Sequence, residues 1–326
     1  MSKKVTIKDI AKLANVSETT VSLVLNDAPS RICVAKKQEI KDIAKKLNYV
    51  PNHFARSLSK RKSKTIGLIL PNIEKVYFSS IAKHIDEIMR LNGYLVYVIS
   101  SDENFENDKS SFLQLVNRQV DGIIICLSND FYDNVDENKK FFSENNFGIP
   151  VLFLSRAFDD AENYIVFDNE LGGFLATEFF IEKFDSKNII FILKDLEIYN
   201  EKLKYDGYAK ALKKYNLDLD RNLIFNLKDY SIENIRKIVE NKNIDGIFCC
   251  SYFVAFAIVA SLNFREDAKI IVYDYSNEKE MFGFKLNYVY DDVKLLSTES
   301  CNAMFDLIEG KRRNVQIILE PCLKIV

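Results

Sequence analysis

The first fifty residues of the chain place apolar side chains at the spacing of three short amphipathic helices. In each helix the apolar positions recur at intervals of three and four residues, as a single buried helix face requires. These positions are Ile7, Ile10, Ala11 and Ala14, then Val21, Val24 and Leu25, then Ile40, Ile43, Ala44 and Leu47 in a third helix from about Val34 to Leu47. The pattern predicts a small three-helix core.

Polar residues mark where the first two helices begin and how they are joined. Thr6 and Ser17 each precede a helical run and are typical N-cap residues. Only Ala14-Asn15-Val16 separates the two runs, and Asn15 tolerates the left-handed backbone of a tight turn. Two short helices joined in this way predict a helix-turn-helix, a motif that places its second helix in the major groove of DNA.

From Thr65 onwards the pattern changes to short apolar runs separated by helical segments. Continuous runs rich in Ile, Val and Leu are typical of parallel strands that are buried on both faces, so the rest of the chain is predicted to be doubly wound α/β. The predicted strands are 66–70, 94–99, 122–126, 151–154, 164–167, 188–193, 223–225, 246–249 and 269–273.

Charge separates the first 64 residues from the remainder. They hold 15 Lys or Arg against 5 Asp or Glu, whereas the remaining 262 hold 30 against 42. Neutralisation of DNA phosphates needs a local cationic face of this kind, which the overall net charge of −2 conceals. A run of Lys-rich helices can also be a solvated surface alone. Together with the helix-turn-helix, the charge favours a DNA-binding unit.

Four separated motifs near the start of the chain resemble the amino-terminal signature of LacI/GalR (lactose repressor-like) transcription regulators. The motifs are Thr6-Ile7-Lys8-Asp9-Ile10-Ala11, then Val16-Ser17 with Thr20-Val21-Ser22 and Val24-Leu25-Asn26, then Leu47-Asn48-Tyr49-Val50-Pro51-Asn52, and Ala55-Arg56-Ser57-Leu58. The similarity continues more loosely through Lys64-Thr65-Ile66-Gly67, Val120-Asp121-Gly122 and Asp168-Asn169, and it fades towards the end. It covers essentially the whole chain.

The resemblance implies roles for the second helix. In the family, residues at the positions of Glu18, Thr19 and Leu23 face base edges, and those at Thr6, Ser17, Ser22 and Asn26 hold phosphates. Leu23 replaces the family's usual Arg, which favours an apolar contact such as a thymine methyl over bidentate recognition of guanine. Glu18 can accept a hydrogen bond from a cytosine amino group or reject wrong sequences. Cys33 stands where the family commonly has a Ser cap, which predicts a weaker start for the third helix.

The segment from Pro51 to Lys60 resembles the family's hinge, which becomes a short helix when two subunits cross the operator centre. Leu58 matches the residue that is wedged between minor-groove base steps, at a cost of roughly a few kcal/mol that added contacts offset. The segment also reads as a charged linker when it is taken alone. The expected hinge residues in contact with DNA are Asn52, Ala55, Arg56, Ser57 and Leu58.

The family resemblance also implies how the chain is divided. We expect a helix-turn-helix domain at 1–49, a hinge at 50–63 and an effector-binding and dimerisation domain at 64–326. The last is expected to resemble periplasmic binding proteins, with two doubly wound parallel-sheet subdomains. The N-subdomain is expected at about 64–161 and 290–317, and the C-subdomain at about 162–288 and 318–326.

A cleft at the carboxyl ends of the strands is the natural ligand site in such a domain. The positions that correspond to effector contacts in the family are Asn72, Phe78, Arg156, Lys204, Tyr252 and Asp274. A Phe here is also compatible with plain core, and an Arg after a strand with a surface ion pair. Two departures weaken a sugar assignment. Lys204 replaces an Arg whose bidentate fork grips hydroxyls, and Cys249-Cys250-Ser251-Tyr252 replaces a small, amide-bearing sequence.

Other chemistry has little support in the sequence. The six cysteines show no C-x-x-C spacing, and His53 and His84 are the only histidines, so we expect no metal and no Cys/His nucleophile. No phosphate-binding glycine loop is present, and we expect no cofactor. A head fused to a sugar-processing enzyme would need an Asp-x-Gly-x-Thr turn, which the chain lacks. The absence of an apolar run of 18 residues and of a signal peptide predicts a soluble, reduced, cytoplasmic protein.

The sequence therefore predicts a homodimeric, ligand-responsive repressor that binds a pseudo-palindromic DNA operator and is not an enzyme. The small-molecule effector is expected to be sugar-like, with a degenerate or non-sugar site as the alternative. A tetramer is compatible with the same sequence.

Overall fold

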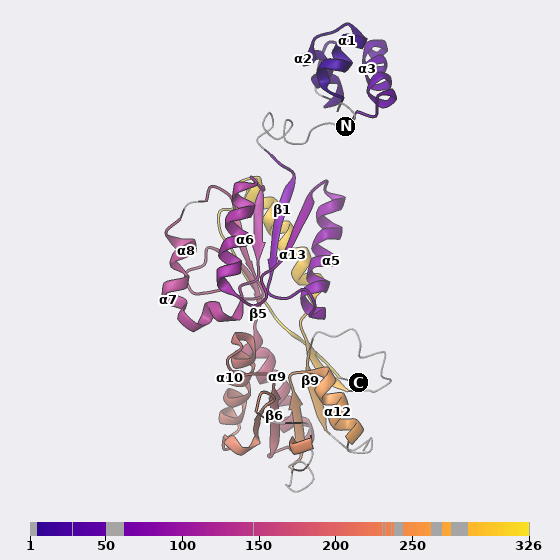
Figure 1. Cartoon of the computed structure of the whole chain (residues 1–326). Coiled ribbons are helices and arrows are strands. Elements are labelled where there is room, and N and C mark those ends of the chain that lie inside the picture. Colours follow the sequence, from indigo (N-terminus) through magenta and orange to yellow (C-terminus); the bar gives the residue numbers. More distant parts are fainter. Residues whose placement is uncertain are drawn as a thin grey trace. The chain divides into compact units, whose positions relative to one another are not determined.

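The structure is a computed structural model that describes residues 5–27, 29–49, 62–145, 147–229, 231, 233–235, 237, 244–261, 269–274 and 286–325. The chain forms two compact units, Met1–Ser63 and Lys64–Val326, which we call the head and the body. Figure 1 shows that the head consists of helices, whereas the body combines helices with strands.

The head contains the three helices that the apolar pattern predicted. They are α1 (Ile7–Ala14), α2 (Glu18–Leu25) and α3 (Val34–Lys46). Their shared core is fully buried at Ile10, Val21 and Ile40, which come from α1, α2 and α3 respectively. The left-handed backbone at Asn15, with φ of 50° and ψ of 51°, confirms the predicted tight turn between α1 and α2.

The N-terminal ends of the three head helices differ in their side-chain caps. The Asp9 carboxylate accepts hydrogen bonds from both the backbone N–H (2.9 Å) and the hydroxyl (2.7 Å) of Thr6. The Ser17 hydroxyl accepts from the backbone N–H of Thr20 at 3.1 Å, as an N-cap residue does. Cys33 is the N-cap residue of α3 and makes no side-chain cap hydrogen bond.

The first sheet of the body has six parallel strands in the order β11-β5-β4-β3-β1-β2. The strands are β1 (Thr65–Leu70), β2 (Leu95–Ser100), β3 (Gly122–Ile125), β4 (Val151–Leu154), β5 (Asn163–Phe167) and β11 (Val315–Leu319). The helices of this subdomain are α5 (Val76–Leu91), α6 (Phe105–Asn117), the 3-10 helix η1 (Asn129–Asn134), α7 (Val135–Asn138), α8 (Lys140–Ser143) and α13 (Val293–Ile308).

Helices cover both faces of this sheet, which explains its continuous apolar strands. Leu68 of β1 packs in the cluster that includes α5 and α13, whereas its neighbour Ile69 packs on the opposite face with α6. Because successive strand residues point to opposite faces, a strand that is covered on both sides must be apolar throughout. Figure 1 shows α5 and α6 flanking the sheet.

The second sheet also has six strands, in the order β12-β10-β9-β8-β6-β7. The strands are β6 (Ile189–Leu193), β7 (Ile224–Asn226), β8 (Gly246–Cys249), β9 (Ile270–Tyr273), β10 (Asn287–Tyr290) and β12 (Cys322–Lys324). All pairs are parallel except that of β10 with β12. The associated helices are α9 (Asn169–Phe184), α10 (Tyr199–Lys214), the 3-10 helix η2 (Arg221–Leu223) and α12 (Tyr252–Ser261).

These two parallel-sheet subdomains confirm the predicted fold class, but the chain first passes between them at a later point than expected. The strand β5 pairs with β4 and β11, so the chain leaves the first sheet after Phe167 and not near 160–163. It returns after Tyr290, and it leaves again between β11 and β12. The expected boundary at 161–162 was implied by the family resemblance and assigned β5 to the C-subdomain, whereas the pairing of β5 with β4 and β11 places it in the first sheet.

Within the second subdomain, α9 and α10 approach each other unusually closely at two glycines. A Cβ atom at Gly173 would collide with the carbonyl oxygen of Lys204, and one at Gly207 would collide with that of Glu170. The absence of both side chains lets the two helix backbones touch. This contact determines where α10 presents Lys204.

Candidate nucleic-acid interface and effector site

The second helix of the head exposes the residues that we predicted to contact bases. Val21 and Val24 are buried against α1 and α3, at 0% and 2% exposure. Glu18 and Thr19 are exposed on the other side of the helix, and Leu23 remains 36% exposed despite its apolar side chain. A short helix that turns an accessible, mixed polar and apolar face outward has the geometry needed to enter a major groove.

Of the predicted phosphate-contacting residues, Thr6, Ser17 and Asn26 flank the helices and Ser22 lies within α2. Ser17 caps α2, and its hydroxyl is also 2.8 Å from that of Thr20. The Asn26 amide donates to the Ser22 hydroxyl at 3.3 Å, while its buried Oδ1 atom has no hydrogen-bond partner. Thr6 is exposed beside the start of α1. The hinge residues Asn52, Ala55, Arg56, Ser57 and Leu58 lie outside the described residues.

One predicted effector residue of the first subdomain, Arg156, is a buried arginine that lies near another, Phe78. Arg156 is 5% exposed and donates from Nη1 to a Glu103 carboxylate oxygen (3.0 Å) and to the carbonyl oxygen of Leu127 (2.9 Å). Burial works against its charge, but neighbours including Glu103 outweigh burial and raise the Arg156 pKa. Its guanidinium lies 5.9 Å from the ring centroid of Phe78, which is itself part of the apolar core.

Asn72 has a local structural role in the same region. Its Oδ1 atom accepts a hydrogen bond from the backbone N–H of Glu74 at 2.8 Å, so the side chain shapes the turn after β1. Of the three predicted residues from this subdomain, only Phe78 and Arg156 are brought into contact.

The predicted effector residues of the second subdomain form another group, at the carboxyl ends of β8 and β9. The Lys204 ammonium lies 4.2 Å from the ring centroid of Tyr273 and 3.5 Å from a Glu201 carboxylate oxygen. The Asp274 carboxylate accepts from the backbone N–H of Tyr252 at 2.8 Å. Tyr252 is only 4% exposed and packs into the core beneath α12. Its ring therefore contributes to packing.

Three residues that our sequence reading missed join the two groups. The Tyr77 hydroxyl, from α5, lies 2.8 Å from that of Ser155, and the Tyr273 hydroxyl donates to Asp291 at 3.0 Å. Asp291 in turn acts electrostatically on both Tyr77 and Lys204. Asp291 follows β10, a strand that the sequence analysis did not predict because it contains no long apolar run. The sequence feature that could have identified Asp291 is the Tyr-Val-Tyr segment directly before it, which is typical of a short strand.

Burial dominates the electrostatics of this cluster. It raises the pKa of Asp291 to about 6, although Lys204 and the Tyr273 hydroxyl favour the charged carboxylate. Burial alone would lower the pKa of Lys204, but Glu201, Cys250 and Asp291 outweigh it and raise that pKa. The cluster thus holds an ammonium among several acidic groups, away from water.

We expect the substitution Asp291→Asn to stabilise the protein at neutral pH. Because the folded pKa is raised above the ordinary 3.8, the native carboxyl favours the fold when protonated, and that contribution is lost as pH rises through about 6. The gain should reach at most about 3 kcal/mol above pH 7 and fall to about 1 kcal/mol at pH 4.5, because it disappears fully only below the unfolded pKa of 3.8. Thermal denaturation of both proteins at the two pH values measures it. An equal gain at both would contradict this explanation.

A set of contacts near η1 ties the two subdomains together. The Tyr132 and Tyr199 rings stack with centroids 4.0 Å apart and planes 11° from parallel. Asn129 accepts from the backbone N–H of Tyr199 (2.9 Å) and donates to the carbonyl oxygen of Glu197 (3.0 Å). Both hydrogen-bonding functions of one amide thus bridge η1 and the start of α10.

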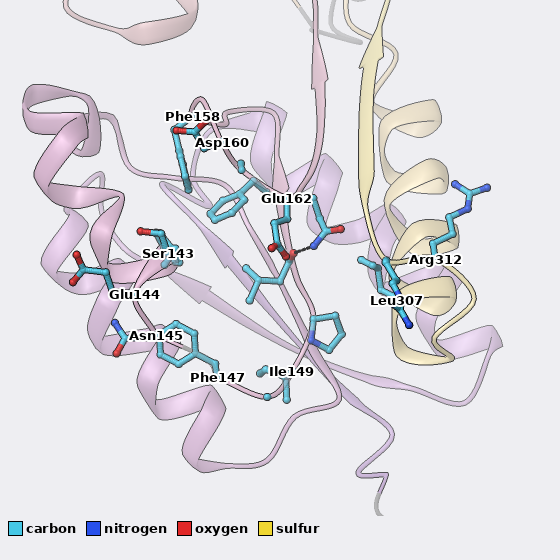
Figure 2. A pocket seen from close by; sticks show the side chains of 18 residues that line it. Ser143, Glu144, Asn145, Phe147, Ile149, Phe158, Asp160, Glu162, Leu307 and Arg312 are labelled. Carbon is cyan, nitrogen blue, oxygen red and sulfur yellow. Dashed lines mark hydrogen bonds between the residues drawn. The ribbon is translucent and has the colours of Figure 1, made fainter.

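A hollow of about 750 Å³ lies at the other end of the first sheet, where β4 and β5 begin. Figure 2 shows Glu144 and Asn145 on one side of it and Leu307 and Arg312 on the other. Its lining includes side chains of both charges and several aromatic rings, and none of the predicted effector residues lines it.

Buried thiols occupy the body. Cys126, Cys249, Cys250 and Cys301 are buried, whereas Cys33 and Cys322 are exposed. Within the described ranges no three His, Cys, Asp or Glu side chains gather as metal ligands would. In the same ranges, no helix is both long enough and apolar enough to cross a membrane.

Two family models match the chain. Residues 6–52 match "Bacterial regulatory proteins, lacI family", and residues 63–241 match "Periplasmic binding proteins and sugar binding domain of LacI family". Among curated proteins, the chain is 28% identical to the "HTH-type transcriptional repressor PurR" of Histophilus somni, over 96% of this chain and 95% of the relative. It is 29% identical to the repressor of that name from Haemophilus influenzae, with 95% and 93% covered.

Solved structures show the same fold. The Lac repressor dimer bound to operator and the anti-inducer ONPF superposes with a TM-score of 0.85 at 22% identity, covering 98% of both chains. The complex of the transcriptional regulator CelR with cellobiose gives a TM-score of 0.67 at 22% identity, covering 99% of both. The head helices and the two parallel sheets are thus folds that both of these solved chains also contain.

Proposed function

Because the chain belongs to the LacI family of bacterial regulatory proteins, we propose that it represses transcription as a homodimer on a pseudo-palindromic operator. It is a DNA-binding transcriptional repressor and not an enzyme. The PurR proteins to which it is similar are also named as transcriptional repressors. The observation that supports this best is the exposed face of α2, where Glu18, Thr19 and Leu23 stand above a buried three-helix core. In a homodimer each head would occupy one half-site.

We also propose that residues 50–63 act as a conditional hinge, with Leu58 as a minor-groove wedge. The composition of this segment supports the proposal, because Arg56, Lys60, Arg61 and Lys62 can neutralise backbone phosphates beside the wedge. Formation of the hinge would then depend on the spacing of two bodies. A small molecule that alters the body would alter operator affinity through that spacing.

We propose that the body binds a small-molecule effector. The effector is either sugar-like or, as the alternative, the site is degenerate or binds a molecule that is not a sugar. Lys204 lacks the bidentate fork that grips neighbouring hydroxyls, and its ammonium is already held against Glu201 and Tyr273. Arg156 is likewise engaged by Glu103 and Leu127. These contacts favour the alternative, because a ligand at these residues would have to displace existing partners.

Reciprocal coupling tests the effector mechanism. If a ligand changes operator affinity, bound operator must change the affinity for that ligand by the same factor. Titrating each tight-binding ligand against free protein and against its operator complex measures both sides. Equal operator affinity with and without every such ligand would defeat the coupling and leave DNA binding itself intact.

We expect alanine at Glu18, Thr19 and Leu23 together to remove sequence preference while preserving general DNA binding. The three side chains are exposed, so the head core stays intact, and the cationic residues of the head, which can neutralise phosphates, remain. Operator affinity should fall by at least about a hundredfold, towards the affinity for random duplex. Competition binding at fixed salt measures the ratio. If the ratio of operator to random-duplex affinity is unchanged, α2 is not the reading helix.

A further inference from the structure

The hollow of about 750 Å³ is formed by the first subdomain alone (Figure 2). The described residues that line it fall within 142–163 and 307–313, so they come from the segments around the starts of β4, β5 and β11. Because these strands are parallel, their amino ends lie at the edge of the sheet opposite the carboxyl ends, where the predicted effector residues lie. A molecule bound in the hollow is therefore additional to any effector between the subdomains.

Aromatic rings form the apolar part of the lining. Phe142, Phe147, Phe153 and Phe158 all line the hollow and pack in one hydrophobic cluster of the subdomain. The rings of Phe142 and Phe153 meet at 88° with centroids 5.0 Å apart, an edge-to-face packing that holds them in place. Phe142 and Phe147 remain partly exposed. They therefore offer apolar surface that a ligand can remove from water.

Two opposite charges lie at the amino ends of adjacent strands. Glu162 directly precedes β5, and Arg313 lies shortly before β11. The ends of these strands are held together, because the Asn163 Oδ1 atom accepts a hydrogen bond from the backbone N–H of Val315 at 3.1 Å. Adjacent strands are about 4.8 Å apart, so the two charged side chains start from neighbouring positions. Both are exposed, and neither side chain has an ion-pair or hydrogen-bond partner within the part of the chain that the structure describes.

We propose that the hollow binds a free α-amino acid with an apolar side chain. Its ammonium group would bond to the Glu162 carboxylate and its carboxylate to the Arg313 guanidinium, as charge-assisted hydrogen bonds. Its side chain would cover Phe142 and Phe147. The two opposite charges beside an aromatic surface match the three parts of such a zwitterion, and the volume is typical of small-molecule sites. Three of the five charged side chains in the lining are carboxylates, which disfavours a ligand that is only anionic.

Isothermal titration of the full chain with matched probes tests the ligand class. L-leucine and L-phenylalanine carry all three parts. L-alanine lacks most of the apolar side chain, 4-methylpentanoate lacks the ammonium group, and 3-methylbutylamine lacks the carboxylate. We expect the two complete ligands to bind, and each reduced probe to bind at least about tenfold more weakly than L-leucine. Absence of binding by both L-leucine and L-phenylalanine, or a reduced probe that binds as tightly as L-leucine, overturns the proposed ligand class.

Variants locate the site. Glu162→Gln and Arg313→Gln each remove one charge from an exposed side chain, so the thermal transition should be retained. Each should weaken L-leucine binding by about tenfold, the equivalent of one charge-assisted hydrogen bond. Arg118→Gln is the matched control and should leave the affinity unchanged, because Arg118 is exposed in the same subdomain but does not line the hollow.

Unchanged L-leucine affinity in both Glu162→Gln and Arg313→Gln refutes the location, and so does an equal loss in the Arg118→Gln control. These measurements need no DNA, so their failure is distinguishable from failure of the operator experiments.

Discussion

Removal of residues 1–61 is expected to lower operator affinity by at least about a thousandfold, the gap that commonly separates specific from non-specific binding. The head holds the exposed face of α2, and residues 1–64 hold 15 of the chain's 45 Lys and Arg residues. The body that remains has 42 Asp or Glu against 30 Lys or Arg across residues 65–326, so it should repel the phosphate backbone.

Salt dependence makes this test sharper. Binding of the full chain should weaken steeply as salt rises, because each neutralised phosphate releases a counterion. The truncated chain should show little binding at any salt concentration, while its thermal transition remains, since the body is a compact unit with its own cores. Retention of salt-sensitive operator binding after truncation would place the DNA interface on the body and refute the proposed function.

The second large effect is expected from Gly207→Ala in α10. Helix propensity alone predicts a gain of about 1 kcal/mol from this change. The new Cβ would collide with the carbonyl oxygen of Glu170 and crowd the backbone nitrogen of Phe174, neither of which can rotate away. The helices must separate, so we expect a net loss of about 3 kcal/mol or more and a fall of roughly 10 °C in the melting temperature.

An exposed position on the same helix supplies the control. Lys202 is exposed, and its replacement by Ala should change stability by less than about 0.5 kcal/mol. The displaced helix also presents Lys204, so any ligand affinity that depends on Lys204 should fall together with stability. A Gly207→Ala protein as stable as the wild type would show that α9 and α10 can move apart freely.

Much of the fold could be predicted because its signals are local. The stripe at Val21 and Val24, the Ser17 cap and the turn at Asn15 each act within a few residues, and the structure confirms all three. Buried parallel strands such as Ile189–Leu193 can be predicted because they are unbroken apolar runs. The short strands β10 and β12 do not, because their stability comes from neighbours distant in sequence.

The candidate sites show the same contrast. Exposure of Glu18, Thr19 and Leu23 follows from helical periodicity alone, since whatever lies opposite the buried stripe must face outward. The positions of the predicted effector residues, by contrast, do not follow from any local sequence pattern. Arg156 lies against Glu103, and Lys204 near Asp291, through contacts that a linear pattern does not contain.

The sequence by itself determined that this protein has a cationic helix-turn-helix head and a doubly wound α/β body, because periodicity, capping and charge are properties of neighbouring residues. Only the tertiary structure decided which polar groups meet between the subdomains. It brought Tyr77 towards Asp291, seated α10 against α9 through Gly173 and Gly207, and left the Oδ1 atoms of Asn169 and Asn200 without donors. Burial and pairing depend on the packing of remote segments, and that is where any response to a ligand must reside.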